Sequence, residues 1–112
     1  MNTPKPNRLP PPYIEPVTID EIRYYLDNIR NSEVSFSITY LFAVDANYDE
    51  IWRIPVYVTK FDTSIETDVQ EVYPISLDYN RDKHSFVIEN EAGDIYTFDL
   101  SSMEVQKAEI IK

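Results

Sequence analysis

Residues 34–61, VSFSITYLFAVDANYDEIWRIPVYVTKF, decide the fold that this sequence predicts. Large apolar side chains occupy every second position from Val34 to Val44, and again from Trp52 to Val58. Alternation with a period of two is typical of β-strands, because successive side chains point to opposite faces of a sheet. The acidic segment 45–50 between the two runs suits a turn. The stretch therefore predicts a β-hairpin whose apolar row forms much of the core.

Further strands are expected downstream of this hairpin. Residues 71–79 alternate in the same way, and residues 84–89 and 94–100 predict a second hairpin around a turn at 90–93. The side chains expected to point inward from that hairpin are Phe86, Ile88, Tyr96, Phe98 and Leu100. Segment 103–111 fits either a final strand or a short helix.

Two prolines, Pro55 and Pro74, fall inside the expected strands. Proline has no backbone N–H to give to a sheet ladder, so we expect both at strand ends, bulges or edges.

Upstream of the hairpin, residues 18–31 predict an amphipathic helix. Thr18 and Glu21 have the spacing of a capping box, in which each side chain satisfies a backbone amide at the helix start. Apolar residues then recur at helical spacing, namely Ile19, Ile22, Leu26 and Ile29. We therefore expect one face of this helix to be buried and the other to be solvated.

These elements predict an α+β fold: one N-terminal helix packed on a five- or six-stranded, mainly antiparallel sheet. A small open β-barrel with one helix is the alternative architecture. Residues 1–17 contain six of the eight prolines and predict an extended arm, which leaves residues 18–112 as a single domain.

The charge of the chain is strongly negative. Twenty acidic residues against ten basic ones give a net charge of −10. A field of this sign repels nucleic acid and anionic membranes and favours a basic protein partner. Solubility alone is the alternative explanation.

Several chemistries lack the residues that they require. Cysteine is absent, which excludes disulfides and thiolate sites and favours a cytoplasmic location, as does the lack of any apolar run long enough to span a membrane. Gly93 is the only glycine, so glycine-rich phosphate-binding loops are excluded. His84 is the only histidine and follows a predicted turn, where a surface role suits it better than a catalytic triad. We therefore expect no enzyme activity and no cofactor.

The turn at 45–50 resembles the start of a calcium loop, because Asp45, Asn47 and Asp49 stand at alternate positions. The sixth position, where such loops need glycine, is Glu50, and the twelfth, where they need glutamate, is Val56. We therefore expect an acidic hairpin tip and no metal site.

The predicted meander places the connection 61–70 and the turn 90–94 at the same end of the sheet. That end would gather acidic side chains as a partner-binding patch, whose members are Asp62, Glu66, Asp68, Glu71, Glu89, Glu91 and Asp94. A patch of one sign favours a basic partner.

The sequence thus predicts a non-catalytic acidic protein-binding domain that engages a basic partner, for example as an inhibitor, as an immunity or antitoxin partner of a toxin, or as a mimic of nucleic-acid charge that binds a nucleic-acid-binding protein. The alternative is a structural or adaptor subunit that docks through its proline-rich arm, where residues 9–13 fit the pattern that WW-type domains bind. A third hypothesis is a small-ligand site under the sheet near Trp52 and Tyr57.

Overall fold

The computed structural model describes residues 13–30, 35–61 and 70–108. Within these ranges the chain forms strands and no helix. The strands are β1 (Val17–Ile19), β2 (Ile22–Arg30), β3 (Phe36–Val44), β4 (Glu50–Lys60), β5 (Pro74–Asn80), β6 (Ser85–Asn90), β7 (Ile95–Asp99) and β8 (Glu104–Lys107).

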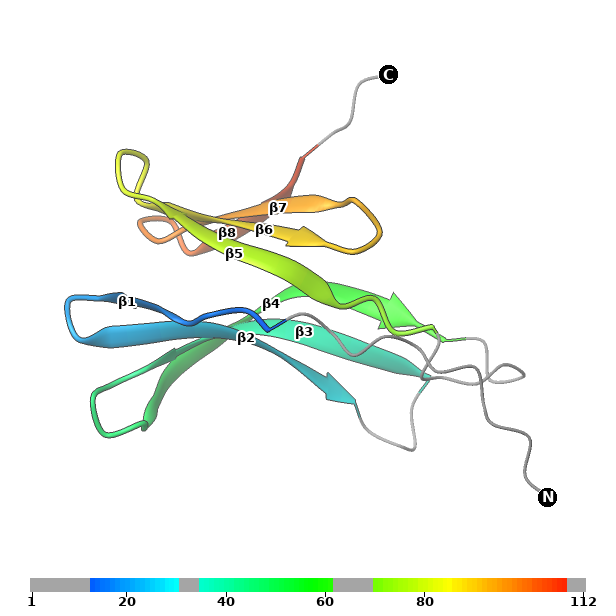
Figure 1. Cartoon of the computed structure of the whole chain (residues 1–112), viewed down its shortest axis with the longest axis horizontal. Coiled ribbons are helices and arrows are strands. Elements are labelled where there is room, and N and C mark those ends of the chain that lie inside the picture. Colours follow the sequence, from blue (N-terminus) through cyan, green and yellow to red (C-terminus); the bar gives the residue numbers. More distant parts are fainter. Residues whose placement is uncertain (1–12, 31–34, 62–69, 109–112) are drawn as a thin grey trace.

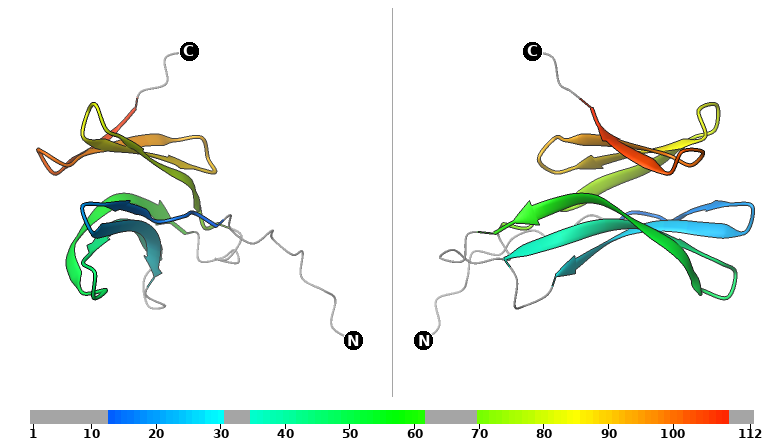
Figure 2. Two further views of the ribbon diagram at one scale, coloured as in Figure 1. Left: turned by 60° about the vertical axis from the view of Figure 1, so that its left-hand side comes forward. Right: turned by 180° about the vertical axis from the view of Figure 1, so that it is seen from behind.

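The strands form two separate four-stranded antiparallel sheets, each in chain order (Figure 1). Sheet A contains β1 to β4 and sheet B contains β5 to β8. The two meanders stack face to face, and β5 approaches β1 and β2 along one side of the stack (Figure 2). The predicted α+β fold is therefore wrong, and so is the open barrel with one helix, because the part of the chain that the structure describes contains neither a helix nor a closed sheet.

The segment predicted as a helix is a hairpin. Ile19 pairs with Ile22, so β1 and β2 are joined by a two-residue loop, Asp20–Glu21. Both loop residues have positive φ, 51° and 69°, as a type I′ turn requires. Thr18 pairs with Arg23 across the strands and caps no helix. The predicted start of the domain at Thr18 falls inside β1.

The central hairpin is confirmed, with β3 and β4 paired along their lengths. The register shifts between Thr39 and Tyr40, where the partner residue changes from Tyr57 to Pro55. Pro55 therefore lies beside a β-bulge on the edge strand of sheet A. Pro74 is the first residue of β5, an edge strand of sheet B, and a register shift follows it there too. Both prolines occupy the positions that the missing N–H predicts.

The second hairpin is also confirmed, as β6 and β7. Its turn is fixed by Asn90, whose side-chain oxygen accepts hydrogen bonds from the backbone N–H groups of Ala92 and Asp94, and Gly93 adopts the left-handed conformation with φ of 88°. The ambiguous tail forms the strand β8, which pairs with β7.

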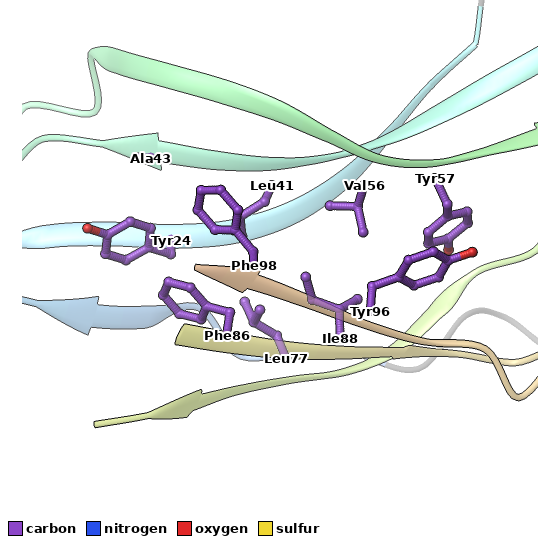
Figure 3. Packing of buried hydrophobic residues seen from close by; sticks show 10 residues of the cluster. All are labelled: Tyr24, Leu41, Ala43, Val56, Tyr57, Leu77, Phe86, Ile88, Tyr96 and Phe98. Atoms are coloured by element: carbon purple, nitrogen blue, oxygen red, sulfur yellow. The ribbon is translucent and has the colours of Figure 1, made fainter. Parts of the chain in front are cut away.

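The hydrophobic core lies between the two sheets (Figure 3). Five side chains of the β6–β7 hairpin were predicted to point inward. Four of them belong to the core, and the fifth, Leu100, packs against it. The core residues are Tyr24, Leu41, Ala43, Val56, Tyr57, Leu77, Phe86, Ile88, Tyr96 and Phe98. Trp52 packs on its edge, 5.5 Å from the ring of Phe98.

The inward face of β3 differs from the prediction. The row that points to sheet B is the smaller one, and it consists of Ser37, Thr39, Leu41 and Ala43, all of which are completely buried. The larger row of alternate residues, which the sequence suggested as core, points away from sheet B. Sheet A therefore carries apolar side chains on both faces.

Candidate functional site

The described members of the predicted acidic patch lie at the end of the molecule where the β6–β7 turn meets the segment that leads into β5 (Figure 1). The backbone N–H of Glu91 donates to the carbonyl of Tyr73 at 2.9 Å, and the N–H of Tyr73 donates to Glu91 Oε1 at 3.0 Å. Residues 70–73 and 90–94 are therefore neighbours. Three members of the predicted patch, Asp62, Glu66 and Asp68, lie outside the described residues.

Glu71 lies at this end but is buried, with only 6% of its surface exposed. Its carboxylate accepts hydrogen bonds from the Ser37 hydroxyl at 2.8 and 2.9 Å and from the side-chain amide of Asn28. These donors come from β3 and β2, so Glu71 anchors the segment before β5 to sheet A. A carboxylate that is satisfied inside the protein is not presented to a partner.

The remaining three members of the patch are closer to solvent. The Asp94 carboxylate lies 3.4 Å from the Lys107 ammonium, which neutralises part of its charge. Glu91 is exposed and holds the backbone of Tyr73, and Glu89 is half-buried on β6. Within the described residues, three acidic side chains of the predicted patch, Glu89, Glu91 and Asp94, are therefore left near solvent at or beside the β6–β7 turn, and Asp94 is paired with Lys107.

The opposite end of sheet A is also acidic. The β1–β2 loop and the β3–β4 turn both lie there (Figure 1), and they contain Asp20, Glu21, Asp45, Asp49 and Glu50. Asp45 holds its own turn, because its carboxylate accepts from the N–H groups of Asn47 and Asp49. Within the described ranges, no cluster of three or more His, Asp or Glu side chains has the arrangement of a metal site.

A groove of about 700 Å³ runs beside the second half of β2. The pairing of β1 with β2 stops at Tyr24, so residues 25–29 have a strand partner only on the β3 side. Residues 13–16 and 71–74 form the other wall of the groove. The described residues that line it are Tyr13, Ile14, Pro16, Tyr25, Leu26, Asp27, Asn28, Arg30, Glu71, Tyr73 and Pro74.

The face of sheet A that points away from sheet B is aromatic at one end. The ring of Tyr25 stacks on Phe42 with 5.0 Å between the centroids. The Arg53 guanidinium lies over Phe42 at 4.9 Å and over Tyr40 at 5.5 Å, and it is held there by a 2.7 Å ion pair with Glu50. Arg53 thus shields this end of the face, as a guanidinium stacked on aromatic rings does.

The other end of the same face is apolar and uncovered. Ile38 pairs with Ile29 on one side and with Val58 on the other, so the three side chains form a row across β2, β3 and β4. Phe36 stands two residues before Ile38 on the same face. Ile29 is 42% exposed, Phe36 39% and Val58 52%. We call Ile29, Phe36, Ile38 and Val58 the outer row; in the part of the chain that the structure describes, no strand lies over it (Figure 2).

Near Trp52 and Tyr57, where the sequence suggested a ligand site, both side chains are packed. Tyr57 stacks on Tyr96 at 5.3 Å, and its hydroxyl donates to the carbonyl of Val72 at 2.7 Å. Burial raises the pKa of the Tyr57 phenol above its ordinary value. Both residues therefore act as core, and the groove lies elsewhere, along β2.

His84 lies in the β5–β6 turn, where the sequence predicted a hairpin-end histidine. Its Nδ1 is 2.8 Å from the hydroxyl of Tyr79. Tyr13, the last residue of the possible WW-binding pattern, is 85% exposed, and the rest of that pattern lies outside the described residues.

No known family model, curated protein or solved structure matches this chain. No helix in the described ranges is long and apolar enough to cross a membrane.

Proposed function

We propose that this chain is a non-catalytic, cytoplasmic domain that binds a basic protein partner through the outer row of sheet A. The observation that carries the proposal is the exposure of this row. Contiguous apolar side chains on the surface of a soluble domain mark interaction sites far more often than scattered ones. The outer row crosses three strands without interruption, as the pairing of Ile29, Ile38 and Val58 establishes.

The chemistry of the partner follows from charge. The chain carries −10, and among the described residues acidic turns lie at one end of sheet A and around residues 90–94 of sheet B. Such a field accelerates association with a basic protein and opposes association of two copies of this chain. The preference for a basic partner rests on this overall field, because the residue paired with Phe36 of the outer row is Lys60.

The aromatic end of the same face supports an interaction role. Arg53 and the rings of Tyr40 and Phe42 are already stacked in the unbound chain. Residues of these types are enriched at the energetic centres of protein interfaces. They would present a preformed surface beside the outer row.

The test compares two isoleucines of nearly equal exposure. Ile29 in the outer row is 42% exposed and Ile75 on β5 is 40% exposed. Extracts of the native host are passed over immobilised wild-type chain, Ile29→Ser and Ile75→Ser at low and moderate salt. We expect a basic protein to bind the wild type and Ile75→Ser, and Ile29→Ser to bind it at least fivefold more weakly, since truncating an interface anchor costs about 1 kcal/mol or more. Equal binding by the two variants would contradict the proposal.

Salt dependence tests the charge component separately. Reversing Asp62, Glu66, Glu89 and Glu91 to lysine should slow association and flatten its dependence on ionic strength. An unchanged salt dependence would show that the acidic end around residues 90–94 takes no part in binding. It would not contradict binding through the outer row.

A second candidate is an adaptor that docks through its proline-rich arm. The exposed ring of Tyr13 favours it. Deleting residues 1–12 distinguishes the two functions, and the deletion stops there because Ile14 packs against the core. An adaptor would lose its partner in this variant, whereas a domain that binds through the outer row would keep it.

A further inference from the structure

We propose that the edge of β2 along residues 25–29 receives an extended basic segment of the partner as an added strand, seated in the groove. The inference rests on the proposed function, because it specifies how the same partner continues past the outer row. Strand addition supplies backbone hydrogen bonds for affinity, while alternate side chains of the added segment supply specificity.

Among the described residues, no strand pairs with this edge of β2. Continuing the β1–β2 register, in which Val17 pairs with Tyr24, would place Pro16 opposite Tyr25. Proline has no N–H to donate, so the ladder stops there. Residues 13–16 continue along the groove wall as a chain segment that is not a strand. Backbone N–H and C=O groups of alternate residues of β2 therefore point away from β3. Within residues 25–29, the N–H of Asn28 donates to Asp27 Oδ1 at 2.9 Å, so an added strand would have to displace that side chain to pair there.

This edge of β2 lacks the features that protect the other long edge of the same sheet. The β4 edge carries Pro55 and two register shifts, and bulges and prolines are devices that block pairing. By contrast, β2 pairs with β3 from Arg23 to Arg30 without a shift. A regular strand that is paired on one side only is the better template for another strand.

The described lining of the groove contains three tyrosines, Tyr13, Tyr25 and Tyr73, and two carboxylates. Glu71 is buried and already satisfied by Ser37 and Asn28, so Asp27 is the carboxylate of this lining that can meet a partner. A lysine or arginine side chain gains from both groups, through charge and through contact with ring faces. Arg30 also lines the groove, but its guanidinium lies over the ring of Phe61 at 5.6 Å. Asp27 and Arg30 carry opposite charges, so the preference for a basic occupant rests on the net charge of −10 that the chain carries.

The edge of β2 is also continuous with the outer row. Asp27 and Ile29 belong to the edge strand and also face outward on sheet A, on the same side as Ile38. A strand added beside β2 extends sheet A, so every second side chain of the added segment lies next to the outer row. One partner can therefore cover both features.

The experiment uses the full chain and blocked hexapeptides as probes. The first peptide alternates lysine and valine, the second alternates glutamate and valine, and the third is the first with its lysine amides N-methylated. Hydrogen exchange of the backbone amides of β2 is followed by NMR. In the chain alone, we expect the amides of residues 25–29 that point into the groove to exchange faster than those that point to β3.

Adding the lysine peptide should protect the fast-exchanging amides of residues 25–29 and leave those of β4 unchanged. The glutamate peptide should give no protection, and N-methylation should weaken binding at least tenfold, because it removes the donors of the ladder. Asp27→Lys should weaken binding of the lysine peptide roughly fivefold, whereas Asp78→Lys, an exposed aspartate on β5, should not.

Four results would overturn the inference: no protection at about 1 mM lysine peptide, equal binding of the N-methylated peptide, protection confined to β4 or β8, or protection of residues 25–29 by self-association without peptide. None of these four results contradicts the proposed function, which is tested by the comparison of Ile29→Ser with Ile75→Ser. Conversely, if the peptide pairs with β2 while those two variants bind the partner equally, the outer row is excluded and the edge stands as a strand acceptor without that partner.

Discussion

Replacing Glu21 by glycine tests the β1–β2 hairpin directly. Glu21 occupies the second position of the two-residue loop with φ of 69°, in the left-handed region. An L-residue with a side chain costs about 1–2 kcal/mol in that conformation, and glycine removes this cost. Glycine also makes the unfolded chain more flexible, which costs about 0.4–1 kcal/mol. The net expectation for Glu21→Gly is a gain of about 0.5–1 kcal/mol in the free energy of unfolding.

The assay is urea denaturation followed by the fluorescence of the single tryptophan, Trp52, together with the thermal midpoint. A gain of this size raises the midpoint by roughly 2–8 °C in a domain of this length. Thr18→Gly is the matched control, since Thr18 is an exposed strand residue paired with Arg23. Glycine at a strand position should destabilise the chain by about 0.5–1 kcal/mol.

The opposite outcome would refute the hairpin. If residues 18–31 formed the helix that the sequence suggests, Glu21 would lie in its first turn and complete a capping box. Glycine there would remove that contact and lower helix propensity by about 1 kcal/mol. A less stable Glu21→Gly variant therefore contradicts the turn, and a more stable one contradicts the helix.

Three further changes probe the core and its polar anchor. Burial raises the pKa of the Tyr57 phenol, whose ordinary value is 10.0 in the unfolded chain. Above about pH 10 the unfolded chain therefore loses this proton while the folded chain keeps it. The free energy of unfolding, measured by urea denaturation, should be insensitive to this group below about pH 10 and should fall above it by up to about 1.4 kcal/mol per pH unit. Tyr57→Phe should make that fall shallower, and an equally steep fall in the variant would contradict the assignment. Glu71→Ala leaves the buried Ser37 hydroxyl and the partly buried Asn28 amide without their acceptor, so it should cost roughly 1–3 kcal/mol, against less than about 0.5 kcal/mol for Glu89→Ala. Equal losses in the two variants would contradict the anchor. Phe86→Ala should cost about 3–5 kcal/mol because Phe86 is completely buried, whereas Phe36→Ala, at a site 39% exposed, should cost far less in the same assay.

The error over residues 18–30 has a specific physical origin. Ile22 and Leu26 are four residues apart, which places them on one face of a helix and also on one face of a strand. Tyr24 lies between them and separates the two cases, because it is on the opposite side of a helix but on the same side of a strand. In the structure Tyr24 is 6% exposed and belongs to the core. The pattern Ile22–Tyr24–Leu26 was therefore the available signal for β2, and the capping-box spacing obscured it.

Sheet B was predicted more accurately because its signals agree with one another. A turn that contains the only glycine separates two runs with the same alternation, and proline marks the first residue of an edge strand. The candidate site was harder to predict. Nothing in the linear sequence distinguishes Glu71, which anchors sheet A to the segment before β5, from the other acidic residues nearby. The groove depends on where β1 stops pairing, for which Pro16 is the only local signal.

The two faces of β3 carry the strongest argument about function. A sheet that packs on one side needs a single apolar row, and antiparallel sheets commonly turn a polar face to water. Here the row that faces sheet B contains Ser37 and Thr39, while Phe36 and Ile38 point the other way. Core formation does not account for large apolar residues on the outer side, but contact with a partner does. Ile29→Ser should therefore change the free energy of unfolding by less than about 1 kcal/mol and still weaken partner binding at least fivefold. A variant that loses stability and binding in parallel would instead assign the outer row to the fold.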